Sequence, residues 1–123
     1  RYGRRQRQMC IRDRQRVAIA RAIILKPQIL ICDEPTSALD VTIQSQILDL
    51  LNDLKTKLNI TIILISHDIS VVKYFSDRII VMYNGEIIEM GNTNNVINIP
   101  KDKYTKRLMS SVFSLKKNDI KFT

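Results

Sequence analysis

Short apolar runs alternate with longer amphipathic stretches along this chain. Residues 29–33, ILICD, and residues 60–66, ITIILIS, are too short for helices and are rich in β-branched residues, which favours buried strands of a parallel sheet covered on both faces. Between them, residues 41–58 place apolar side chains three and four positions apart, and Asp40 can cap this helix at its start. The sequence therefore predicts one right-handed βαβ unit. The apolar helical positions are Ile43, Ile47, Leu50, Leu51, Leu54 and Leu58.

Further elements flank this unit. Residues 15–25 read as a helix that ends before Pro27. The runs RIIVMY and EIIEM are separated by Asn84 and Gly85, a dipeptide typical of a tight hairpin turn. A short helix is expected near 93–98 and a last one over 103–113. The predicted fold class is α/β, with a parallel βαβ core followed by a β-hairpin and terminal helices.

The charge is unevenly spread over the 123 residues. Residues 1–16 hold seven of the 20 Lys+Arg and one of the 12 acidic residues, a balance of +6 that leaves +2 of the total +8 for the rest. A basic arm can bind phosphate backbones or acidic lipids, but Arg-rich termini are also commonly just solvated. Two cysteines fit a reducing setting, in which Cys32 serves as a small buried hydrophobe.

Three polar residues follow the two predicted strands. Asp33 and Glu34 end the first strand and His67 comes just after the second. The carboxyl ends of parallel strands meet at one edge of a sheet, where ligands bind in open α/β folds. Each residue has a plainer role open to it: Asp33 can cap a turn, and Glu34 or His67 can be solvated. Together they supply what phosphoryl transfer needs, namely an acid for Mg²⁺, an acid for water and a polar group for a terminal phosphate.

These segments resemble four motifs of ATP-binding cassette (ABC) proteins, in the family's order. ILICDEP resembles the Walker B strand, SALD the D-loop, SHD the histidine switch, and QRVAIARAIILKPQ the helix between the signature motif and Walker B. The resemblance implies the C-terminal half of a P-loop NTPase, the ABC nucleotide-binding domain. It implies ATP and Mg²⁺ as cofactors.

The same resemblance implies roles for individual residues. Asp33 would hold Mg²⁺ through water, Glu34 would polarise the attacking water, and His67 would contact the γ-phosphate. The D-loop would lie beside the nucleotide and face a partner subunit. It comprises Ser37, Ala38, Leu39 and Asp40.

The C-terminal stretch narrows the resemblance. DRIIVMYNGEIIEMG followed by NIPKDKYTKRLMSSV is similar to the ends of ATPase subunits of oligopeptide, dipeptide and nickel importers. This implies an ATP-hydrolysing subunit that is peripheral on the cytoplasmic face of the cell membrane. Its partners would be a second ATPase subunit, identical or different, transmembrane permease subunits and, indirectly, a solute-binding protein.

Two departures from the family pattern set expectations for the chain itself. No G-x-x-x-x-G-K-[ST] phosphate loop occurs, and residues 9–13 read MCIRD where the signature Leu-Ser-Gly-Gly-Gln is expected. We therefore expect an inactive isolated chain and interpret it as a truncated or mis-joined gene product. The expected divisions are a basic non-family head at 1–14, disordered or non-native, an ABC ATPase part at 15–113 and a frayed tail at 114–123.

Two other function classes remain open. One is an ABC ATPase coupled to nucleic acid or translation, which the basic head would support. The nearly neutral body and the transporter-like tail argue against nucleic acid as a partner. The other is a non-enzymatic fragment.

Overall fold

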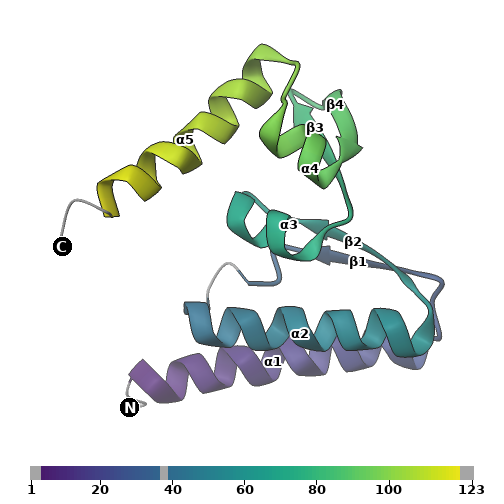
Figure 1. Cartoon of the computed structure of the whole chain (residues 1–123). Coiled ribbons are helices and arrows are strands. Elements are labelled where there is room, and N and C mark those ends of the chain that lie inside the picture. Colours follow the sequence, from purple (N-terminus) through teal and green to yellow (C-terminus); the bar gives the residue numbers. More distant parts are fainter. Residues whose placement is uncertain (1–3, 37–38, 120–123) are drawn as a thin grey trace. The chain divides into compact units, whose positions relative to one another are not determined.

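The computed structural model describes residues 4–36 and 39–119, with side chains placed at 13–36 and 39–112. The chain divides into two compact units, the first ending at His67 and the second beginning at Asp68. Figure 1 shows their elements in chain order. The first unit contains α1 (Arg4–Ile24), β1 (Ile29–Asp33), α2 (Val41–Leu58) and β2 (Thr61–Ile65). The second contains α3 (Ile69–Phe75), β3 (Arg78–Tyr83), β4 (Glu86–Asn92), α4 (Thr93–Asn98) and α5 (Lys103–Asp119).

The predicted βαβ unit is confirmed. Strands β1 and β2 pair in parallel, from Ile29 opposite Thr61 to Asp33 opposite Ile65. The Asp40 side chain caps α2, because its Oδ1 accepts the backbone N–H of Ile43 at 3.0 Å. These contacts fix the two strand ends side by side.

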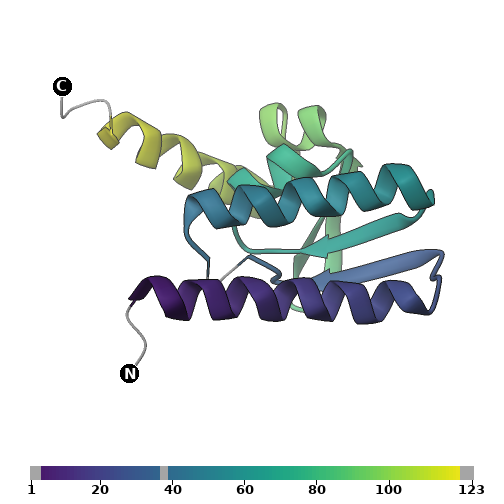
Figure 2. The same ribbon diagram turned by 90° about the horizontal axis from the view of Figure 1, so that it is seen from below.

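The two long helices cover one face of this strand pair. Figures 1 and 2 show α1 and α2 running next to each other on the same side of β1 and β2. The buried apolar side chains of this unit come from α1, β1, α2 and the residue just before β2, whereas no side chain of β2 is fully buried. They are Ile19, Leu30, Cys32, Ile47, Leu48, Leu51 and Ile60.

Within the described residues of the first unit, no element covers the other face of the strand pair. Side chains alternate across a strand, so the neighbours of the buried positions project away from α1 and α2. Ile29 and Ile31 are 56% and 64% exposed, and Ile63 and Ile65 are each 47% exposed. The described part of the first unit therefore covers these strands on one face only, and the expectation of strands covered on both faces is not met within this unit.

The predicted hairpin forms the centre of the second unit. Strands β3 and β4 pair antiparallel, from Arg78 opposite Asn92 to Tyr83 opposite Glu86. Asn84 and Gly85 both have positive φ, 49° and 78°, as a type I′ turn requires. A register shift after Val81 marks a β-bulge. Helices α4 and α5 pack on the hairpin around a shared core of Ile79, Val81, Val96, Ile97 and Met109.

One helix was not predicted, and two others are longer than predicted. Helix α3 was not predicted, because its seven residues are too few to show a clear amphipathic period. Helix α1 begins at Arg4 instead of residue 15, through a stretch of Arg, Gln and Met that favours helices without an apolar period. Helix α5 continues to Asp119, past the predicted end at 113. The division of the chain at residues 14 and 113 stays a prediction.

A carboxylate joins the hairpin to the start of α5. Glu89 Oε1 accepts the backbone N–H groups of Lys101 and Asp102 at 2.8 and 2.7 Å. Asp102 Oδ1 in turn accepts the N–H of Tyr104 at 2.8 Å. The last bond satisfies a backbone donor in the first turn of α5 that has no partner within the helix, and the two bonds to Glu89 hold the segment just before α5. None of the described helices combines the length and the apolar character that crossing a bilayer requires.

Candidate active site at the strand ends

The parallel pairing brings the three predicted site residues to one edge. Asp33 and Ile65 are opposite each other at the ends of β1 and β2, so Glu34 and His67 both follow directly from paired strand ends. The Glu34 backbone N–H donates to the carbonyl of Ile65 at 2.8 Å. This edge is the one at which the sequence predicted a site.

Glu34 and His67 are in direct contact. The His67 backbone N–H donates to Glu34 Oε1 at 3.1 Å, and His67 Nδ1 lies 2.9 Å from the same oxygen. The imidazole is 80% exposed and the carboxylate 34% exposed. Because water reaches both groups, this contact contributes little to folding stability and acts chiefly on the orientation of the two side chains.

The backbone of Glu34 adopts a left-handed conformation. Its φ is +48°, a region that costs a residue with a side chain roughly 1–3 kcal/mol. Hydrogen bonds from its N–H to Ile65 and from His67 to its carboxylate accompany this conformation. Backbone strain of this kind is concentrated at functional sites, where it re-aims a side chain.

Asp33 is exposed at the tip of β1. Across the described residues, no three His, Cys, Asp or Glu side chains are grouped to enclose a metal ion. Mg²⁺ is usually held by one or two carboxylates together with water and substrate phosphates. Asp33 therefore fits a Mg²⁺ that arrives with a nucleotide.

The predicted D-loop is only partly described. Ser37 and Ala38 lie outside the described residues, whereas the Leu39 N–H donates to the Thr36 carbonyl at 3.2 Å. Asp40 is engaged as the cap of α2. Thr36, which was not predicted to be buried, is only 3% exposed and anchors this turn. Its neighbours in the sequence, a proline and a serine, are typical of a loop and do not indicate a buried threonine.

Cys32 lies one residue before these acids. Burial raises the pKa of its thiol, because the interior disfavours the thiolate. The predicted role as a small buried hydrophobe agrees with this environment, and the neutral thiol is a poor nucleophile and metal ligand.

Known proteins support an assignment to one family. A protein-family model described as "ABC transporter" matches residues 1–37, which include the basic head. The oligopeptide transport ATP-binding protein OppF of Salmonella typhimurium is 51% identical over 98 residues, which cover 80% of this chain and 29% of OppF. The dipeptide transport ATP-binding protein DppF of Lactococcus lactis is 52% identical over 100 residues, covering 81% of this chain and 32% of DppF.

A solved structure agrees with these relatives. CbiO1 from Clostridium perfringens, part of the ABC transporter complex CbiONQ, matches with a TM-score of 0.67 and 40% identity, covering 72% of this chain and 35% of CbiO1. The chain spans about a third of the length of the curated relatives it matches. Sequence and fold therefore agree that this chain belongs to the ABC transporter ATP-binding proteins and is homologous to those of oligopeptide and dipeptide transport.

Proposed function

We propose that this chain is part of an ATP-hydrolysing subunit that energises an ABC importer of peptides, with nickel as the alternative solute. The observation that carries the proposal is the contact between Glu34 and His67 at two parallel strand ends. It occurs in a chain that shares half its aligned residues with an oligopeptide transport ATP-binding protein.

The proposed chemistry assigns one role to each residue. Glu34 orients and polarises the attacking water, since its carboxylate is accessible and its backbone is held in a fixed, left-handed turn. His67 contacts the γ-phosphate and is oriented by Glu34. Asp33 holds Mg²⁺ through water, and Mg²⁺ would neutralise the phosphate charge that develops during transfer.

The proposed partners follow from the family. Residues Ser37, Ala38, Leu39 and Asp40 would face a second ATPase subunit close to the bound nucleotide. Transmembrane permease subunits would hold the two ATPase subunits at the cytoplasmic face of the membrane, and a solute-binding protein would deliver the solute. In the complete ATPase domain that we propose, a further layer packs against the exposed isoleucines of β1 and β2. In this chain those side chains are exposed to water.

A chimera tests the proposed activity. Residues 15–113 of this chain replace the matching segment of the oligopeptide transport ATP-binding protein OppF of Salmonella, and Mg²⁺-dependent ATP hydrolysis is measured. The chimera should hydrolyse ATP. Glu34→Gln should lower turnover by about 10²-fold or more while ATP still binds, because the amide cannot polarise water.

The matched control is Glu86→Gln, which removes an exposed carboxylate from the hairpin far from the strand ends in sequence. It should leave turnover unchanged. Equal turnover in the two variants would show that Glu34 is a turn residue only. A folded chimera that binds ATP without hydrolysing it would contradict the proposed function as a whole.

A further inference from the structure

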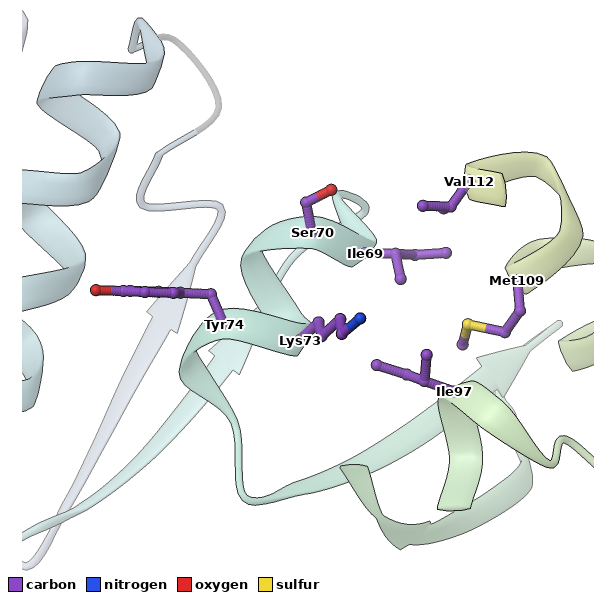
Figure 3. A pocket seen from close by; sticks show the side chains of 7 residues that line it. All are labelled: Ile69, Ser70, Lys73, Tyr74, Ile97, Met109 and Val112. Atoms are coloured by element: carbon purple, nitrogen blue, oxygen red, sulfur yellow. The ribbon is translucent and has the colours of Figure 1, made fainter. Parts of the chain in front are cut away.

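The second unit contains a cavity of about 340 Å³ among α3, α4 and α5 (Figure 3). Its most deeply buried lining residues are Ile97 of α4 and Met109 of α5, each 4% exposed. Ile69 of α3 and Val112 of α5 are half-buried beside them. Ser70, Lys73 and Tyr74 complete the lining. The volume lies at the lower end of the range for small-molecule sites.

Lys73 is the charged member of this lining. Lys73 is exposed, and Figure 3 shows its side chain extending in the direction of Ile97 and Met109, which line the same cavity. Within the part of the chain that the structure describes, Lys73 forms no ion pair. An ammonium group beside apolar surface favours an anion that also offers apolar atoms to that surface.

We propose that this cavity binds a medium-chain alkanoate, with its carboxylate at Lys73 and its alkyl chain against Ile97, Met109 and Val112. A single lysine as a point charge suits one compact anionic group. Burial of the alkyl chain supplies most of the affinity, since each buried methylene contributes about 0.8 kcal/mol. This site is formed by residues of the second unit alone and does not depend on the proposed ATPase function.

The probe is octanoate, added at millimolar concentration to the isotope-labelled full chain and followed by amide NMR. The resonances of Ile69, Ile97, Met109 and Val112 should shift in a saturable manner. Lys73→Gln should weaken octanoate binding about fivefold, the upper range for an exposed ion pair. The matched control Lys106→Gln removes an exposed lysine of α5 that does not line the cavity and should bind octanoate as the unchanged chain does.

Two further probes separate the contributions of charge and chain. Octanol, which has the same chain length without the anion, should bind more weakly than octanoate and be insensitive to Lys73→Gln. Acetate should not bind. Val112→Trp should fill the cavity and block octanoate, with saturation-transfer NMR on the ligand as a second measurement of binding.

Several outcomes would overturn the proposal. Octanoate that shifts no lining resonance and receives no saturation transfer shows that the cavity is not a site. If octanol and octanoate bind equally well, the cavity binds only the alkyl chain and Lys73 does not recognise the carboxylate. Equal losses in Lys73→Gln and Lys106→Gln show only a general effect of positive charge.

Discussion

Glu34 Oε1 accepts the backbone N–H of His67 at 3.1 Å and lies 2.9 Å from Nδ1 of the same residue. One carboxylate oxygen therefore contacts both the main chain and the ring of a residue on the neighbouring strand end. This contact follows from the pairing of β1 and β2, since the N–H of Glu34 also donates to Ile65.

The left-handed backbone of Glu34 leads to a prediction about stability. Glu34→Gly and Glu34→Ala both remove the carboxylate, but glycine accepts φ near +48° without strain. The glycine variant should therefore be more stable than the alanine variant by about 1 kcal/mol. Hydrogen exchange of the β1 and β2 amides, measured for both variants at increasing urea concentration, gives the difference in their free energies of unfolding. Equal stability would indicate that this turn relaxes when the carboxylate is lost.

Local chemistry explains what could be predicted from the sequence. The Asp40 cap and the Asn84–Gly85 turn depend on residues adjacent in the chain, and both are confirmed. The strand ends of Asp33 and His67 could be placed together because parallel pairing obeys general rules.

Properties that depend on distant residues could not be predicted. The left-handed φ of Glu34 is accompanied by hydrogen bonds to Ile65 and His67, which lie more than thirty positions away. The exposure of Ile31 and Ile63 depends on which layers cover the sheet, and an apolar run alone does not report this. Helix α3 is defined by its Asp68 cap and by packing more than by its own pattern.

Thr105 provides a test of core packing in the second unit. Its side chain is fully buried, and its Oγ1 has no hydrogen-bond partner in the part of the protein that the structure describes. Thr105→Val removes the unsatisfied hydroxyl and keeps the shape, so it should raise the free energy of unfolding by about 1 kcal/mol. Thr105→Ser keeps the hydroxyl and loses a methyl group, so it should lower it by about 1 kcal/mol.

Urea unfolding monitored by tyrosine fluorescence can measure both Thr105 variants. Tyr74, Tyr83 and Tyr104 all lie in the second unit, and the Tyr83 and Tyr104 rings are 4.6 Å apart between centroids. A clear loss of stability in Thr105→Val would show that the hydroxyl is bonded in solution, for example to water.

The buried thiol of Cys32 predicts a pH dependence. Because burial raises its pKa, the folded chain keeps the proton after the unfolded chain has lost it. The stability linked to this thiol is therefore complete below the unfolded pKa of about 8.5 and is lost as the pH rises toward the folded pKa. From neutral to alkaline pH, the unchanged chain should therefore lose more of its free energy of unfolding than the Cys32→Ala variant does. A constant difference over that pH range would contradict burial of the thiol.

The absence of a phosphate loop from the sequence predicts that this chain alone does not hold ATP. Backbone N–H groups and a lysine normally cradle the phosphates, and the role proposed for Glu34 concerns water and does not replace that cradle. Isothermal calorimetry with Mg-ATP should detect no binding in the micromolar range, whereas the OppF chimera should bind. Micromolar binding by the chain alone would mean that another element serves as the phosphate cradle.

The exposed face of β1 and β2 predicts self-association. Ile31 and Ile63 are direct neighbours in the parallel register and are 64% and 47% exposed, so they form the centre of an apolar surface. Burying one such side chain fully contributes about 1.5–3 kcal/mol, which is enough to drive contacts between chains. The double variant Ile31→Thr with Ile63→Thr keeps β-branched side chains on both strands and should reduce association in sedimentation velocity. Ile87→Thr, at an exposed isoleucine of the hairpin, is the matched control and should associate as the unchanged chain does. If the unchanged chain stays monomeric as its concentration rises, the exposed apolar face of β1 and β2 does not drive association.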